Sequence, residues 1–139
     1  MTTPPGAPAG RPPDTEGPLA LIVDDNEKNL KLARDVLRAA GFRTLEGASG
    51  AEGIALAKRH RPDVILMDLG LPDMDGTDAA RAIRGEPLTA GIPVVALTAL
   101  QLDDTDWLHV AGFDGHLSKP IDVAEFPEQV RRYCTRAGG

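Results

Sequence analysis

Two uninterrupted apolar runs, each ending at an aspartate, constrain the fold of this chain more than any other feature. Residues 19–23 read LALIV and stop at Asp24, and residues 64–67 read VILM and stop at Asp68. Their apolarity is continuous rather than alternating, which is typical of strands that are buried on both faces of a sheet. The two runs therefore predict an α/β fold whose sheet carries helices on both faces.

The rest of the chain alternates between strand and helix patterns. Strands are expected at residues 19–23, 42–46, 64–67, 92–97 and 113–117, and helices at about 30–40, 49–60, 77–84, 101–111 and 122–133. Right-handed crossovers in such a fold bring the carboxyl ends of all the strands to one edge of the sheet. Function in these folds is found in the loops along that edge.

The last expected helix contains a proline in an unfavourable place. Asp122 is expected to cap this helix, and its inner face is expected to carry Val123, Phe126, Val130 and Tyr133. Proline is tolerated in the first turn of a helix, but Pro127 would lie beyond that turn. Either the helix begins later than this pattern indicates, or it is kinked at Pro127.

The chain has 139 residues, enough for one domain with a buried core. Residues 1–18 are rich in Pro, Gly, Thr and Ala, which predicts a mobile tail in front of a domain at residues 19–136. This segment lacks the apolar region of a signal peptide, and no stretch reaches the roughly 20 apolar residues that span a bilayer. We therefore expect a soluble, cytoplasmic protein.

Charge and cysteine content exclude several classes of function. The net charge is −6, from 21 acidic and 15 basic residues, so neither nucleic acid nor an anionic membrane is an expected partner. Cys134 is the only cysteine, which excludes an internal disulfide and a site built from several thiolates. We expect Cys134 to pack as a small side chain near the end of a helix.

The residues that end the expected strands carry the strongest functional signal. Asp24 and Asp25 follow the first strand, Asp68 the third, Thr98 the fourth and Lys119 the fifth. Each residue alone is an ordinary cap, turn or surface residue. Together they would place three carboxylates, a hydroxyl and an ammonium group at one edge of the sheet.

Such a group of side chains has a defined chemistry. Three neighbouring carboxylates repel one another unless a cation offsets their charge. Since no His or Cys accompanies them, the expected ion is Mg²⁺, or Mn²⁺ in its place. Lys119 and Thr98 could bind phosphoryl oxygens, and a carboxylate such as Asp68 can act as a nucleophile and form an acyl phosphate.

At this point the chain resembles a known family. The segments IVDDN (22–26), MDLGLPDMDG (67–76), ALTA (96–99) and SKP (118–120) resemble, in order and spacing, the receiver domain of bacterial response regulators. The resemblance runs from about residue 19 to about residue 133. It implies a doubly wound, flavodoxin-like (βα)5 sheet and a role in two-component signal transduction or a phosphorelay.

The resemblance implies a metal-dependent phosphoacceptor. Asp68 would accept the phosphoryl group. Asp25, Asp68 and the main-chain carbonyl of Gly70 would ligate Mg²⁺ directly, and Asp24 would act through a bound water. Many receivers carry a side chain at the position of Gly70 that shields the phosphate, and here Leu100 is the candidate for apolar cover instead.

The resemblance also implies a switch. Lys119 would bind the acyl phosphate, Thr98 would move towards it, and the bond before Pro120 would be cis, which only X-Pro bonds adopt at low cost. The family usually has an aromatic ring three residues before the lysine, where this chain has His116. Three interpretations of His116 are open: it replaces that ring, it makes the switch pH-sensitive because imidazole titrates near pH 6.5, or it is a tolerated surface residue.

Partners follow from the same resemblance. The phosphoryl donor would be a histidine kinase or a histidine phosphotransfer protein. No output module follows the last expected helix, so we expect a stand-alone regulator or relay that acts by binding an unidentified downstream protein. Trp107 is either an exposed anchor for such a partner or a core residue. His60 and His109 are expected at the surface.

Two other classes compete with this interpretation. Phosphatases of the haloacid-dehalogenase type also use a strand-end aspartate, but they need a second acid where this chain has Gly70. A flavodoxin-like cofactor binder would need a phosphate-binding loop after the first strand, where Asp24 and Asp25 would repel phosphate. We therefore expect no turnover of an external substrate, only self-phosphorylation from a donor and autodephosphorylation.

Overall fold

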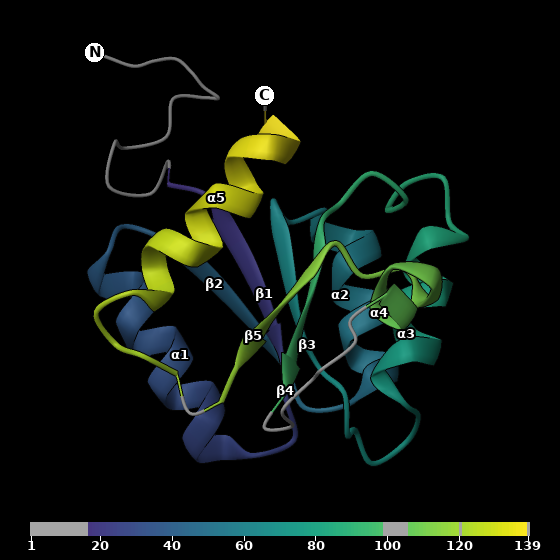
Figure 1. The fold of residues 1–139 in the computed structure, drawn as a ribbon, viewed down its shortest axis with the longest axis horizontal. Coiled ribbons are helices and arrows are strands. Elements are labelled where there is room, and N and C mark those ends of the chain that lie inside the picture. The colour runs from purple at the N-terminus through teal and green to yellow at the C-terminus, as the bar shows by residue number, and fades with distance from the viewer. Residues whose placement is uncertain (1–16, 99–105, 120, 139) are drawn as a thin grey trace.

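The computed structural model describes residues 17–98, 106–119 and 121–138 of the chain. Within them, strands and helices alternate along the whole fold (Figure 1). The elements are β1 (Leu19–Val23), α1 (Glu27–Ala39), β2 (Arg43–Gly47), α2 (Gly50–His60), β3 (Val64–Asp68), α3 (Gly76–Arg84), β4 (Val94–Thr98), α4 (Asp106–Ala111), β5 (Gly115–Ser118) and α5 (Phe126–Gly138). The predicted alternation is confirmed.

The sheet has the topology of a doubly wound fold. All its strands are parallel, in the order β2-β1-β3-β4-β5. The chain runs from β1 out to β2 and then returns past β1 to β3, so the direction of winding reverses between β1 and β3. In such sheets the crevice at the carboxyl ends of the strands, at this reversal, is where ligands bind. This flavodoxin-like arrangement is the predicted one.

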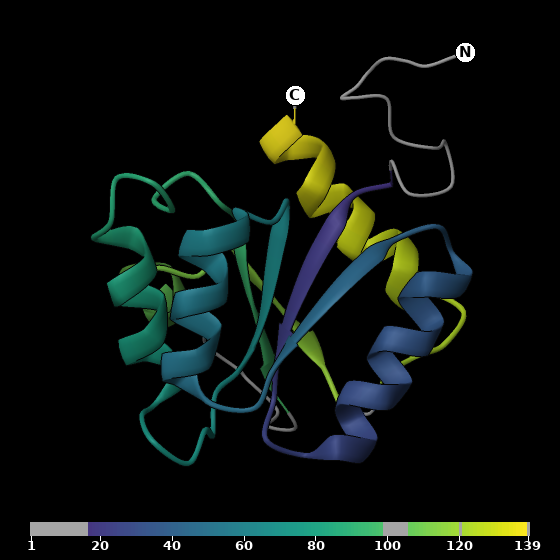
Figure 2. The ribbon, with the colours of Figure 1, turned by 180° about the vertical axis from the view of Figure 1, so that it is seen from behind.

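Each face of the sheet is covered by its own set of helices. Helices α1 and α5 pack on one face, and α2, α3 and α4 pack on the other (Figures 1 and 2). Alternate residues of β1 divide between the two cores, with Ala20 and Ile22 facing α1 and α5, and Leu21 and Val23 facing the other helices. Burial on both faces explains why the apolar run of this strand is unbroken.

Local signals set the ends of the first two helices. The side chain of Asn26 caps α1 by accepting hydrogen bonds from the backbone N–H groups of Lys28 and Asn29. The chain leaves α1 through Gly41, whose φ of 96° favours glycine. Ser49 caps α2, as predicted, by accepting a hydrogen bond from the Glu52 N–H.

The predicted start of the last helix was wrong, and the structure shows why the proline is tolerated. Helix α5 begins at Phe126, so Pro127 lies in its first turn, where no N–H donor is needed. Asp122 instead closes the preceding turn, accepting hydrogen bonds from the N–H groups of Ala124 and Glu125. Val123 lies in that turn and is 57% exposed rather than part of the inner face.

Two strands also begin two residues later than predicted. Strand β4 starts at Val94, directly after a proline that cannot donate to the ladder. Strand β5 starts at Gly115, because the Phe113 N–H still donates to the Leu108 carbonyl at the end of α4. Both strands nevertheless end where the sequence predicted, at Thr98 and close to Lys119.

Two further sequence predictions concern burial and membranes. Cys134 is free and 7% exposed in α5, as predicted. In the described part of the chain, no helix has both the length and the apolar character that crossing a membrane requires.

Candidate functional site

The carboxyl ends of four strands bring the predicted residues to one edge of the sheet. Asp24 directly follows β1, Asp68 is the last residue of β3, Thr98 is the last residue of β4, and Lys119 directly follows β5. The ladder keeps these ends level, since Asp68 pairs with Leu97 and the Lys119 N–H donates to the Thr98 carbonyl at 2.8 Å. Parallel pairing thus assembles a site from segments that lie up to about 95 residues apart.

Three carboxylates form the centre of this site. Asp24, Asp25 and Asp68 each offer a carboxylate oxygen, and these oxygens lie within 4.8 Å of one another. Asp24 is buried, Asp68 is half-buried and Asp25 is exposed. The set combines two inner carboxylates with one that faces solvent, which leaves an open side from which a ligand can approach.

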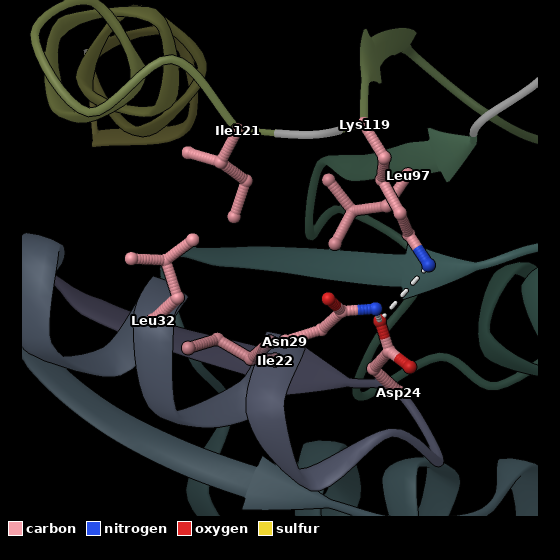
Figure 3. Close-up of a pocket in the computed structure, with 7 residues that line it drawn as sticks. All are labelled: Ile22, Asp24, Asn29, Leu32, Leu97, Lys119 and Ile121. Atoms are coloured by element: carbon pink, nitrogen blue, oxygen red, sulfur yellow. Dashed lines mark hydrogen bonds and ion pairs between the residues drawn. The ribbon is translucent and has the colours of Figure 1, made fainter.

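Lys119 lies between the two inner carboxylates. Its Nζ is 3.0 Å from Asp24 Oδ2 and 3.3 Å from Asp68 Oδ1. Figure 3 shows the lysine extending from the end of β5 towards Asp24. One ammonium group therefore serves two carboxylates, and the third carboxylate in the cluster adds negative charge that this lysine does not neutralise.

Burial and charge perturb the ionisation of this pair. The pKa of Asp68 is raised, mainly because burial disfavours its charged form and also because Asp24 is near, while the Gly70 N–H and Lys119 act in the opposite direction. Burial alone would lower the pKa of Lys119, but its contacts with Asp24 and Asp68 outweigh burial and raise it. Lys119 therefore stays charged at neutral pH.

Asp24 is held by more partners than the sequence indicated. Its Oδ1 accepts a hydrogen bond from the Asn26 N–H at 2.9 Å, and its Oδ2 accepts one from Asn29 Nδ2 at 3.3 Å in addition to the Lys119 contact. Asn29 was missed by the sequence analysis. The signal that could have found it is its position on the first turn of α1, one residue before the buried face that starts at Leu30.

A small cavity lies beside the Asp24–Lys119 pair. Its volume is about 30 Å³, and its walls come from α1, β1, β4 and the segment after β5 (Figure 3). The lining residues are Ile22, Asp24, Asn29, Leu32, Leu97, Lys119 and Ile121. A space of this size accommodates about one or two water molecules, so it is too small for a flavin or nucleotide.

The loop between β3 and α3 forms another wall of the site. The Gly70 N–H donates to Asp68 Oδ1 at 3.3 Å, and Gly70 forms an isolated antiparallel bridge with Asp75. The Gly76 N–H closes the loop on the Leu69 carbonyl at 2.9 Å. A Cβ at Gly76 would lie 2.5 Å from the Asp68 carbonyl oxygen, so this closure requires glycine.

Gly70 itself is not forced by crowding. A Cβ at this position would meet no atom within 4 Å, so there is room for a side chain beside Asp68 that this chain does not use. Leu100, which the sequence analysis named as alternative cover, lies outside the described residues.

The predicted switch residues lie on neighbouring strands. Thr98 is 3% exposed at the end of β4. His116 is half-buried on β5, the strand at the edge of the sheet, where it pairs with Ala96. Pro120 lies outside the described residues, as do the side chains of Trp107 and His109; His60 is exposed, as predicted.

Comparison with known proteins agrees with this geometry. Residues 20–131 match the model of the response regulator receiver domain family. The polar-differentiation response regulators DivK of Brucella anthropi and Brucella ovis are each 39% identical to the chain over 114 residues, which cover 81% of this chain and 93% of each relative.

Solved structures show the same similarity. The receiver domain of the sensor histidine kinase PA1611 from Pseudomonas aeruginosa, with a magnesium ion coordinated in its active-site cleft, is 35% identical, with a TM-score of 0.78 and coverage of 86% of this chain and 98% of that one. The chemotaxis response regulator CheY4 of Vibrio cholerae is 26% identical, with a TM-score of 0.79 and coverage of 84% and 98%.

Proposed function

The chain belongs to the response regulator receiver family of two-component signalling, and we propose that Asp68 accepts a phosphoryl group from a histidine kinase or a histidine phosphotransfer protein with Mg²⁺ present. The observation that carries this proposal is the cluster at the sheet edge. Three carboxylates lie within 4.8 Å of one another, and Lys119 contacts two of them. A divalent cation would offset the negative charge of the carboxylates, and the Lys119 ammonium can bind a phosphoryl oxygen.

The donor set fits Mg²⁺. Carboxylate and carbonyl oxygens are the ligands that hard cations prefer, and the PA1611 receiver domain has a magnesium ion coordinated in its own active-site cleft. Asp25 and Asp68, with the Gly70 carbonyl, would hold the ion directly. Both oxygens of Asp24 already accept hydrogen bonds within the protein, which favours a role through a bound water. When bound, Mg²⁺ offsets the negative charge of the carboxylates and of the phosphoryl oxygens.

Phosphoryl transfer would use the nucleophilicity of Asp68. A carboxylate oxygen forms a bond to phosphorus while the bond between phosphorus and the donor's imidazole nitrogen breaks. The nitrogen keeps the electron pair of that bond and takes up a proton. Lys119 favours the ionised form of Asp68 that must attack, and its ammonium can afterwards hold a phosphoryl oxygen.

Signalling would follow from movement at the neighbouring strands. Thr98 is buried at the end of β4, and its hydroxyl would bind another phosphoryl oxygen. His116 on β5 would respond as the family's aromatic ring does. The altered surface would then be recognised by a downstream protein. The DivK relatives support such a regulatory role, which we place in the cytoplasm with the kinase.

The protein would not turn over an external substrate. Gly70 occupies the position at which a phosphatase of similar chemistry needs its general acid. Release of phosphate would then be limited to hydrolysis of the protein's own acyl phosphate.

The test uses phosphoramidate, whose P–N bond resembles that of phosphohistidine. Incubation with Mg²⁺ should give a phosphoprotein that hydroxylamine cleaves, because hydroxylamine attacks an acyl phosphate and spares a phosphoserine. The Asp68→Asn variant should remain unmodified. A hydroxylamine-resistant adduct, or an adduct of the same yield on Asp68→Asn, would contradict the proposal.

A further inference from the structure

The N-terminus of α2 is capped by a residue from the loop that borders the site. Asp73 Oδ1 accepts a hydrogen bond from the Gly50 N–H at 2.8 Å, and Asp73 Oδ2 accepts one from the Ala51 N–H at 2.9 Å. Both oxygens of one carboxylate are therefore used on the first two donors of a helix that begins 23 residues earlier in the chain.

Helix α2 also has a local cap from neighbouring residues. Ser49 Oγ accepts from the Glu52 N–H, and Glu52 Oε1 accepts in return from the Ala48 N–H at 2.7 Å. The Gly53 N–H bonds to the Ser49 carbonyl. The two donors left over at this end are the two that Asp73 takes. Its contribution is thus additional to the local cap, and it ties the loop to the helix.

Electrostatics favour this contact. A carboxylate at the N-terminus of a helix is attracted by the positive end of the helix dipole. The N–H groups of Ala51 and Gly50 lower the pKa of Asp73 below its ordinary value, so the carboxylate is ionised at neutral pH and the contact persists there.

Side-chain packing also holds the loop against the N-terminus of α2. Met74 lies against Gly50 so closely that a Cβ on this glycine would be 2.5 Å from Met74 Cγ. One turn later, α2 rests on β1, since a Cβ on Gly53 would be 2.7 Å from Val23 Cγ2. Val23 is the last residue of the strand that leads into Asp24 and Asp25. The end of α2 is thus placed relative to the end of β1.

The loop between β3 and α3 connects this contact with α2 to the carboxylate site. It starts at Asp68, and the Gly70–Asp75 bridge and the Gly76–Leu69 hydrogen bond close it into a compact turn. Asp73 lies within this turn and is bound to α2. A displacement of the Asp73 end would therefore shift Gly70, which lies on the bridge.

We propose that Asp73 is a positioning residue for the metal site: through α2 it holds the Gly70 carbonyl in place relative to Asp25 and Asp68. The proposal rests on the Mg²⁺ site of the proposed function. Asp73 itself would not ligate the ion. It acts as an outer support, and removal of such supports typically lowers metal affinity by about 10- to 100-fold.

The experiment is a Mg²⁺ titration of the phosphate-free protein, followed by calorimetry and by the backbone amide signals of residues 68–76. Asp73→Ala should raise the dissociation constant for Mg²⁺ about tenfold. Asp73→Asn keeps one acceptor oxygen and should fall between that variant and the wild type. With acetyl phosphate, the Mg²⁺ concentration for half-maximal phosphorylation should rise in the same order, with a smaller change in the maximal rate.

Ser49→Ala is the matched control, because it weakens the same end of the same helix and leaves the loop tied. Its Mg²⁺ affinity should equal that of the wild type even where its melting temperature falls. Equal affinities in Asp73→Ala and wild type, or equal losses in Asp73→Ala and Ser49→Ala, would overturn the positioning role. A wild-type protein that binds no Mg²⁺ would instead refute the proposed function, and Asp73→Asn tests the inference if Asp73→Ala does not fold.

Discussion

At the carboxyl end of the sheet one lysine contacts two of three clustered carboxylates, whereas at the amino end Arg84 and Asp114 neutralise each other. There, Arg84 donates through Nε to the Gly112 carbonyl at 3.0 Å and through Nη1 to the Ala90 carbonyl, and it forms an ion pair with Asp114. Asp114 also accepts from the Val94 N–H, at the start of β4. These contacts join α3, α4 and the starts of two strands.

The difference shows what each end of the sheet contributes. Arg84 and Asp114 are matched in charge and in hydrogen bonds, so they stabilise the fold. The carboxyl end keeps an excess of negative charge that only a cation can relieve. Such unfavourable arrangements persist where function requires them.

The largest expected effect is at the amino end. Arg84→Ala should lower the free energy of unfolding by about 2–3 kcal/mol, because it removes three hydrogen bonds and leaves the partly buried Asp114 without its ion pair. Urea denaturation measures this loss. Arg132→Ala is the control, since its pair with Glu128 is exposed and should be worth less than about 0.5 kcal/mol. If both variants lost a similar free energy of unfolding, the Arg84 contacts would contribute no more to stability than an exposed ion pair.

At the carboxyl end we expect a substitution to raise the free energy of unfolding, by a smaller amount. Asp68→Asn should raise the free energy of unfolding by about 1 kcal/mol at pH 7, because it removes one of the mutually repelling carboxylates while Lys119 keeps Asp24. It should also abolish phosphorylation. A destabilised Asp68→Asn protein in Mg²⁺-free buffer would show that the cluster is not strained.

That gain should depend on pH in a defined direction. The folded-state pKa of Asp68 is raised above 3.8, so ionisation of this group opposes folding. The advantage of Asp68→Asn should therefore be complete above the folded pKa and disappear as the pH falls below about 3.8, the unfolded value. Urea titrations of both proteins at a series of pH values measure this, and a gain that grows on acidification would contradict it.

Asp68 and Asp73, at the two ends of one loop segment, should have pKa values shifted in opposite directions. Burial and Asp24 raise the pKa of Asp68, whereas the N–H groups of Ala51 and Gly50 lower that of Asp73. Carboxyl ¹³C signals recorded without Mg²⁺ should place the Asp68 midpoint above that of Asp73. The reversed order would mean that the site is not crowded or that the α2 contact is absent in solution.

The smallest expected effect concerns the access of an alkylating reagent to the Cys134 thiol, at the amino end of the sheet. Cys134 on α5 is buried, and burial together with the charge of Asp63 raises the pKa of its thiol to about 12. The native protein at pH 8 should therefore resist iodoacetamide, while the urea-unfolded protein reacts at the rate of an ordinary thiol. Rapid native alkylation would show that this end opens readily.

The strands and the residues that follow them could be predicted from the sequence, because both depend on local patterns. Unbroken apolar runs identified the strands, and the residues at the ends of these runs identified the cluster of Asp24, Asp68 and Lys119. The hydrogen bond from Asn29 to Asp24 and the Asp73 cap on α2 were not predicted, because they join segments whose relative placement depends on helix packing. The start of α5 was misplaced because Asp122 caps a turn in the same way that it would cap a helix.

The charge imbalance at the carboxyl end, on this proposal, serves phosphorylation of Asp68. Intact-mass spectrometry after incubation with acetyl phosphate tests it most directly, with and without Mg²⁺, for the wild type and Asp68→Ala. We expect one added phosphoryl group that requires both Mg²⁺ and Asp68. An adduct that forms equally without Mg²⁺ or on Asp68→Ala would rule out this role of Asp68, as would the absence of both an adduct and beryllofluoride binding.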